Sequence, residues 1–278
     1  MIGTPTPATR LIALLGDPIS HSLSPAFQNA AFREAGVDGV YLALRCGAAE
    51  VPGLIRGIAQ AGGGGNVTIP HKGVAAASVD RRTEAVELTG ACNTYWLEGG
   101  EVWGDNTDVA GVTESVRSLL GARPAGARVL VIGAGGAARA AVAAVVADGA
   151  GEVVVVNRTP DRCASLLERF ADAPVRAATW AGLSGDSFDL AVNATSLGLH
   201  SGDPLPADPS TLGAAAALDL VYAPGGTRWL HALQAAHIPA IDGIEMLIHQ
   251  GVASFRRWWG IDPSIEAMRA ALSDLPPP

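Results

Sequence analysis

The chain has 278 residues, of which 49% are hydrophobic and 17% are charged, so about two folded domains are expected rather than extensive disorder. The net charge of −8 argues against a surface that binds nucleic acid or an anionic membrane. The apolar runs near the N-terminus and at residues 140–147 are too short for a signal peptide or a membrane span, which predicts a cytoplasmic protein.

The first hundred residues alternate short apolar runs with helical patterns. Strands are expected at residues 11–16, 39–46 and 65–69, helices at 24–36, at 50–62 and from about Pro70, and a hairpin at 91–104. In the first helix we expect Ser24 as the N-cap, Pro25 as the first helical residue and Gly36 as the terminator. This alternation predicts a mostly parallel sheet covered by helices.

A different organisation follows the amphipathic helix expected at residues 107–120 and the linker at 121–127. Six candidate strands lie at residues 128–133, 151–157, 174–178, 188–196, 216–222 and 238–242, and such a series predicts a doubly wound sheet. Residues 243–275 are expected to be helical and to pack back on the first domain. The predicted fold class is therefore α/β, with one domain made of residues 1–106 plus about 244–278 and a Rossmann domain of residues 107–243.

The strongest phosphate-binding pattern begins at Gly133. Gly133, Gly135 and Ala138 fit G-x-G-x-x-[GA] directly between a predicted strand and a predicted helix. Glycines allow a tight turn and a close approach of backbone N–H groups to a pyrophosphate, which the helix N-terminus attracts. A tight turn without a ligand is the alternative, but the strand–turn–helix setting favours a dinucleotide site.

The end of the next strand indicates which dinucleotide binds. NAD sites usually carry an acidic residue there, whereas this chain has Asn157, Arg158 and Thr159. Arg158 could pair with a 2′-phosphate and stack on the adenine. NADP is therefore the preferred cofactor, and a solvated surface arginine is the alternative.

Two polar motifs in the first domain have the chemistry of a substrate site. Ser22 and Ser24 could hold a carboxylate together with N–H groups at a helix start, although capping by Ser24 is an alternative. Asp108 enters the connecting helix, where a charge favoured by the helix dipole is the alternative. We interpret His21 and His71 as packing or structural residues.

Nine motifs occur in one order between Gly16 and Gln250: GDPISHSLSP, NVTIPHK, GACNT, GDNTD, GAGGAAR, NRT, NATS, DLVY and DGIEMLIHQ. Together they resemble the shikimate dehydrogenase family, whose members reduce 3-dehydroshikimate to shikimate with NADPH and catalyse the reverse reaction. The resemblance implies that the first domain binds the substrate and carries the catalytic groups, and that the Rossmann domain binds NADP.

The resemblance also implies a role for individual residues. The implied catalytic residues are Lys72 and Asp108, one on each side of the reacting oxygen. The implied substrate contacts are Ser22, Ser24 and Tyr222 at the carboxylate, and Asn66, Thr68, Asn93 and Gln250 at the ring hydroxyls. The implied cofactor contacts are Gly133, Ala134, Gly135, Gly136 and Ala137 at the pyrophosphate, Asn157, Arg158 and Thr159 at the adenosine phosphate, and Thr195, Leu220 and Gly243 beside the nicotinamide.

Lys72 is the single lysine of the chain, and the other eighteen basic residues are arginines. Hydride delivered to a carbonyl carbon leaves an oxyanion that needs a proton. A desolvated lysine can supply that proton near neutral pH, whereas arginine remains protonated. The sequence therefore favours Lys72 as an acid–base group, and it leaves open whether Lys72 transfers the proton itself or stabilises charge.

Several alternatives stay open at this stage. Val109, His71 and Glu245 depart from the family's usual residues, which leaves room for a paralogue that acts on quinate or aminoshikimate with looser cofactor choice; Ser24 favours shikimate. A non-catalytic NADP-binding sensor is an alternative of a different class. Cys46, Cys92 and Cys163 lack a CxxC pair and predict buried free thiols rather than a metal site. A monomer or a homodimer is expected.

Overall fold

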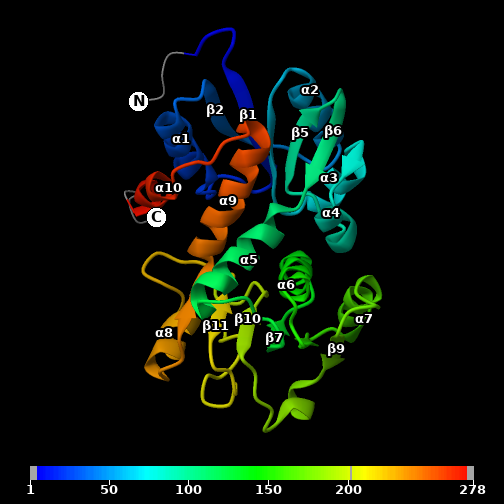
Figure 1. The fold of residues 1–278 in the computed structure, drawn as a ribbon, viewed down its shortest axis with the longest axis vertical. Coiled ribbons are helices and arrows are strands. Elements are labelled where there is room, and N and C mark those ends of the chain that lie inside the picture. Colours follow the sequence, from blue (N-terminus) through cyan, green and yellow to red (C-terminus); the bar gives the residue numbers. More distant parts are fainter. Residues whose placement is uncertain (1–4, 201, 274–278) are drawn as a thin grey trace. The chain divides into compact units, whose positions relative to one another are not determined.

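The computed structural model describes residues 5–200 and 202–273, and the chain divides into two compact units (Figure 1). One unit holds the residues up to Thr107 and those from Gln250 onward, and the other holds Asp108–His249. Each unit is built on its own six-stranded sheet. The α/β class predicted from the alternating pattern is thus confirmed.

The sheet of the first unit has the strand order β2-β1-β3-β5-β6-β4. Its strands are β1 (Arg10–Gly16), β2 (Gly39–Arg45), β3 (Gly64–Val67), β4 (Arg81–Arg82), β5 (Thr94–Glu98) and β6 (Glu101–Asp105). β1 pairs in parallel with β2 and β3, and β4 pairs in parallel with β6. The hairpin β5–β6 is antiparallel and joins β3 in the antiparallel sense, so the sheet is mostly parallel, as predicted.

Helices cover this sheet from both ends of the chain. They are α1 (Ser24–Ala35), α2 (Val51–Gln60), α3 (Lys72–Ser78), α4 (Glu84–Thr89), the later turns of α9 (Gly243–Trp259), and α10 (Ile265–Ser273). On α9, Phe255, Trp258 and Trp259 contact Phe32 and Tyr41, with ring centroids 5.3 to 6.5 Å apart. These aromatic contacts hold the C-terminal helices on the first unit, as the sequence predicted.

The start of α1 differs from the prediction. Ser24 is not the N-cap: Leu23 holds that position, and no side chain caps the helix. The Leu23 carbonyl accepts the amide of Ala26, so Ser24 is already the first residue of the helix. Gly36 ends the helix in the left-handed conformation with φ 65°, as expected for a C-terminal glycine. The short elements β4 and α4 were not predicted, because two exposed arginines and a six-residue helix carry no periodic signal.

The sheet of the second unit has the order β12-β11-β10-β7-β8-β9 and is parallel throughout. Its strands are β7 (Arg128–Ile132), β8 (Glu152–Val156), β9 (Val175–Ala178), β10 (Leu190–Asn193), β11 (Ala217–Asp219) and β12 (Ala240–Ile241). The six predicted strands are confirmed. The order reverses between β7 and β10, which is the topological switch point of a doubly wound sheet.

Helices lie on both faces of this second sheet. They are α5 (Thr107–Leu120), α6 (Gly136–Ala147), α7 (Pro160–Arg169), α8 (Arg228–Ala235) and the 3-10 helix η1 (Trp180–Leu183). In β7, Val129 and Val131 pack with α5, α6 and α7, whereas Leu130 and Ile132 pack with α8 and η1. The near-continuous apolar strands of this half reflect this burial on both faces.

The three cysteines are buried free thiols, as predicted. Within residues 5–200 and 202–273, we find no helix whose length and hydropathy would let it cross a bilayer.

Candidate functional site

Lys72 is the first residue of α3 and is half-buried. Its carbonyl accepts the backbone amide of Cys92 at 2.9 Å, which places the lysine beside the segment that carries Asn93. The preceding residue, His71, is buried, with its Nε2 2.8 Å from the Cys46 carbonyl oxygen. His71 therefore has the structural role predicted for it, whereas His21 is exposed and has no packing role.

Asn66 and Asn93 are both buried. Asn66 lies on β3, and Asn93 directly precedes β5, the neighbour of β3 in the first unit's sheet. The side-chain amide of Asn66 donates to the Asn93 carbonyl at 2.9 Å, and the backbone amide of Val67 donates to the same carbonyl at 2.8 Å. The Asn93 Oδ1 accepts the backbone amide of Thr107 at 2.8 Å. The structure thus brings Lys72, Asn66 and Asn93 into one group.

Tyr41 links this group to the serine motif. Its hydroxyl is fully buried and donates to the Asn66 Oδ1 at 2.8 Å. Burial raises the pKa of the Tyr41 phenol, and a hydrogen bond with the Ser24 side chain opposes this shift. Ser22 stays close to Ser24, because its Oγ lies 3.3 Å from the Ser24 amide nitrogen. Ser24 is therefore linked to Asn66 through one buried phenol, and Ser22 lies beside Ser24.

Thr68 and Gln250 complete the set in the first unit. The Thr68 methyl lies against Gly16, where an added Cβ would come within 2.5 Å of it, so Thr68 adjoins the start of the serine loop. Gln250 is buried, and its carbonyl accepts the Ser254 hydroxyl at 3.0 Å. Asp108, the buried second residue of α5, and the half-buried Tyr222 belong to the second unit.

The glycine turn in the second unit has the geometry that its pattern predicts. Gly133 has φ 115°, and a Cβ there would meet the Ala194 carbonyl oxygen at 2.9 Å. Only glycine therefore lets the loops after β7 and β10 approach so closely. Gly135 and Gly136 are exposed, and no side chain of the described residues caps α6. This leaves the first N–H groups of α6 available to an anion.

Strand β8 is the neighbour of β7 in the sheet, and two of the residues that follow it, Arg158 and Thr159, are exposed. The Asn157 side chain donates to the Thr159 carbonyl at 3.0 Å and shapes the loop, while Arg158 projects from an exposed position. Arg162, also exposed, lies one helical turn further on.

Thr195, Leu220 and Gly243 are tied together by a buried polar pair. The Asn193 side chain donates to Asp219 at 2.8 Å and accepts the Thr195 hydroxyl at 2.7 Å. A Cβ on Gly243 would lie 2.4 Å from the Leu220 carbonyl oxygen, so glycine is required there. A Cβ on Gly133 would lie 3.2 Å from the Thr195 methyl. These residues therefore form one cluster at the switch point.

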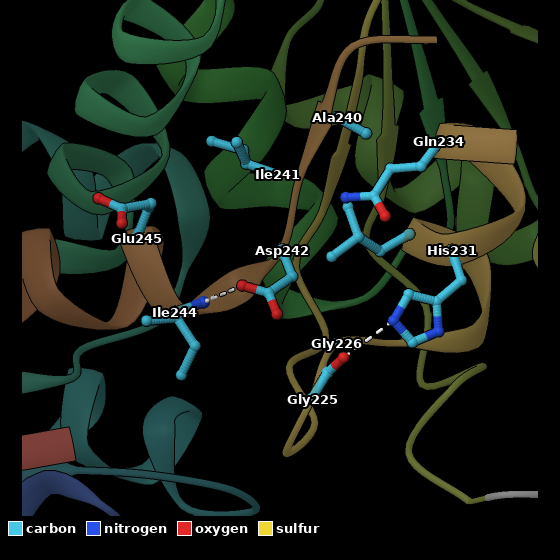
Figure 2. A pocket seen from close by; sticks show the side chains of 10 residues that line it. Gly225, Gly226, His231, Gln234, Ala240, Ile241, Asp242, Ile244 and Glu245 are labelled. Atoms are coloured by element: carbon cyan, nitrogen blue, oxygen red, sulfur yellow. Dashed lines mark hydrogen bonds between the residues drawn. The ribbon is translucent and has the colours of Figure 1, made fainter. Parts of the chain in front are cut away.

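A separate cavity of about 480 Å³ lies in the second unit (Figure 2). It is bordered by α8, β12 and the first turn of α9. The His231 Nε2 lies 2.8 Å from the Gly225 carbonyl oxygen, and the Asp242 Oδ1 accepts the Ile244 amide at 3.1 Å. Its lining residues are Gly225, Gly226, Leu230, His231, Gln234, Ala240, Ile241, Asp242, Ile244 and Glu245. None of the predicted site residues lines it, so we assign neither substrate nor cofactor to it.

Comparison with known proteins decides the family. The shikimate dehydrogenase substrate binding domain matches residues 14–95, shikimate/quinate 5-dehydrogenase matches residues 115–197, and the shikimate 5'-dehydrogenase C-terminal domain matches residues 243–272. A shikimate dehydrogenase (NADP+) of Rubrobacter xylanophilus is 41% identical, over 95% of this chain and 96% of its own. The chain belongs to the shikimate dehydrogenase family.

Solved structures agree with this membership. Shikimate 5-dehydrogenase of Thermus thermophilus, in complex with NADP(H) and shikimate, superposes with a TM-score of 0.86 and 35% identity, over 95% of this chain and 99% of that one. The ligand-free 5-ketofructose reductase of a Gluconobacter species gives 0.87 with 27% identity, over 96% and 98%. Because a 5-ketofructose reductase shares this fold, the fold alone does not identify the substrate.

The buried carboxyl of Asp219 makes folding of this shikimate dehydrogenase domain pH-dependent. Burial raises the pKa of Asp219 above its ordinary 3.8, although hydrogen bonds from Thr227, Asn193 and the Val221 amide oppose the shift. The folded state thus holds this proton more tightly than the unfolded chain. The contribution of Asp219 to the free energy of unfolding is full below pH 3.8 and is lost as the pH rises through the folded pKa.

We predict that Asp219→Asn removes this dependence. The free energy of unfolding of wild type minus that of the variant should be greatest at about pH 4 and fall toward neutral pH, as measured by urea unfolding at several pH values. Asp208→Asn is the control: hydrogen bonds from Ser210 lower the pKa of Asp208, so its difference should change in the opposite direction. A difference for Asp219→Asn that rises with pH would contradict the assignment.

Proposed function

We propose that this chain catalyses the reversible, NADPH-dependent reduction of 3-dehydroshikimate to shikimate. The observation that carries the proposal is the bond of the Lys72 carbonyl to the Cys92 amide, which sets the backbone of the single lysine next to the segment of Asn93, whose carbonyl accepts the Asn66 side chain. Relatives named shikimate dehydrogenase (NADP+) that align along nearly the full chain support the same reaction.

The residues of the second unit fit NADP. The exposed, uncapped start of α6 offers N–H groups to a pyrophosphate, and Gly133 removes the Cβ that would separate the loops. We propose that Ala134, Gly135, Gly136 and Ala137 hold the pyrophosphate and that Asn157, Arg158 and Thr159 hold the adenosine phosphate. Thr195, Leu220 and Gly243 would flank the nicotinamide. When bound, NADPH supplies the hydride for the substrate carbonyl.

Lys72 and Asp108 are the proposed acid–base residues. An ammonium group can donate a proton to the oxygen that becomes the new hydroxyl, and a carboxylate can hold that ammonium group or share the proton. Lys72 is held by its backbone at the start of α3. Because this backbone contact does not involve the side chain, the start of α3 should keep its place when the amine is replaced.

The remaining polar groups would orient the ring acid. We propose that Ser22, Ser24 and Tyr222 bind its carboxylate, and that Thr68, Asn93 and Gln250 bind its hydroxyls. Asn66 has internal partners for both ends of its carboxamide, so we propose that it acts mainly by orienting Asn93. The division into a substrate domain and an NADP domain, a cytoplasmic location and the choice between monomer and homodimer stay predictions.

The proposal is tested by turnover of three substrates. Purified protein is mixed with shikimate, quinate or aminoshikimate, each with NADP and with NAD, and NADPH or NADH formation is followed by absorbance. We expect the highest kcat/KM for shikimate with NADP. A preference for quinate or aminoshikimate would replace the proposed substrate, and binding of NADP without turnover of any substrate would favour the sensor.

Substitution of Lys72 tests the acid–base role. Lys72→Ala should lower kcat by about 10²- to 10⁴-fold, because a positioned proton donor contributes that much, while NADP binding measured by fluorescence titration is retained. Lys72→Arg should be equally impaired, since guanidinium keeps the charge but does not release a proton.

The control is Arg56→Ala, which removes a cation of the surface pair Arg56–Asp80 at 2.7 Å. It should leave kcat unchanged. Turnover by Lys72→Arg near the wild-type rate would show that charge alone suffices and would remove the proton-transfer role.

Substitution of Arg158 tests cofactor choice. Arg158→Ala should raise KM for NADP by about tenfold, because the charge-assisted contact with the 2′-phosphate is lost, while KM for NAD stays within about twofold. Arg123→Ala, an exposed arginine of the same unit, is the control. Equal increases for NADP and NAD would place Arg158 away from the 2′-phosphate.

A further inference from the structure

One face of α9 carries three polar residues, two of which bond to strands of the first unit's sheet. Gln250, Ser254 and Arg257 are spaced i, i+4 and i+7, so they share a helix face. Arg257 pairs with Asp105 at the end of β6, with Nη2 to Oδ2 at 2.8 Å. Ser254 lies between Gln250 and Arg257 on this face and is fully buried. Ser254 lies outside the sequence motifs that predicted the site.

The Ser254 hydroxyl has four polar neighbours within 3.0 Å. They are the Asn66 Nδ2 at 3.0 Å, the Thr94 Oγ1 at 2.8 Å, the Thr107 Oγ1 at 3.0 Å and the Gln250 carbonyl oxygen at 3.0 Å. A hydroxyl provides one donor and two acceptor positions. The Gln250 carbonyl takes the one donor of Ser254. Its two acceptor positions can then take the Asn66 amino group and the hydroxyl of one of the two threonines, Thr94 or Thr107.

Backbone partners define which way both asparagine side chains point. The Asn66 amino group donates to the Asn93 backbone carbonyl, and the Asn93 Oδ1 accepts the Thr107 backbone amide. The hydroxyls of Thr94 and Thr107 lie 2.9 and 3.0 Å from the same Asn93 Oδ1. The Asn93 side chain is therefore held at its oxygen by donors from β5 and from the start of α5.

We propose that Ser254 is a positioning residue for substrate binding: it accepts the Asn66 amino group and donates to the Gln250 carbonyl, and Asn66 in turn bonds to the Asn93 backbone, so Ser254 holds the Asn93 segment and the Gln250 turn in register. Its hydroxyl also ties the Gln250 turn of α9 to β3 and β5. Removal of this one oxygen takes an acceptor from the Asn66 amino group and the donor from the Gln250 carbonyl, so the Gln250 turn loses its bond to β3 and β5. This inference rests on the proposed function.

The test compares two buried serines, each of which donates to the backbone carbonyl four residues earlier in its helix. Ser254→Ala should raise KM for shikimate by about tenfold, whereas KM for NADP stays within about twofold. Ser115→Ala is the matched control, because Ser115 is fully buried and donates to the Gly111 carbonyl four residues earlier at 2.8 Å, as Ser254 does to Gln250. It should leave both KM values within about twofold.

Thr94→Val is the second variant, since it removes the other central hydroxyl while keeping the side-chain shape. It should raise KM for shikimate in the same direction. The inference is overturned if Ser254→Ala behaves like Ser115→Ala, if KM for NADP rises equally, or if both Ser254→Ala and Thr94→Val fail to fold. Wild-type protein that neither binds nor turns over shikimate would instead overturn the proposed function, and this inference with it.

Discussion

A buried carboxamide needs partners for its oxygen and for its amino group, and Asn66 takes its partners from four segments of chain. Tyr41 comes from β2, the Asn93 carbonyl from the loop before β5, Thr94 from β5, and Ser254 from α9. Of the residues proposed to bind substrate, Asn93 and Gln250 lie on these same segments. The need to satisfy one side chain thus holds together parts of the first unit that are up to 213 residues apart along the chain, counting from Tyr41 to Ser254.

The second unit uses a similar arrangement at the switch point of its sheet. Asn193, at the end of β10, bonds to Thr195 and to Asp219 at the end of β11. Asp219 in turn accepts the hydroxyl of Thr227 at 2.6 Å, which caps α8. Each unit therefore has a buried asparagine near the carboxyl end of a parallel strand, where doubly wound proteins place their ligands. The polar atoms that satisfy one another there also lie next to the proposed ligand contacts.

The sequence was informative wherever a local pattern determined the structure. The apolar strands of both units, the glycine turn at Gly133 and the α/β class followed from periodicity and from the steric freedom of glycine. Ser24 was wrongly expected to cap α1, because the preceding turn already places Leu23 in the capping position. The contacts of Ser254 and Tyr41 were missed, because they depend on tertiary pairing between segments that no local pattern connects. The individual site assignments stay predictions.

The solitary lysine has a practical consequence. Lys72 is the single side chain with a primary amine, and it is half-buried at the start of α3. Acylating reagents that modify lysine can therefore attach a fluorophore or an isotope to one side chain, without the background that most enzymes give. Comparing the rate of this modification with and without added shikimate would report whether a bound ring acid covers the amine.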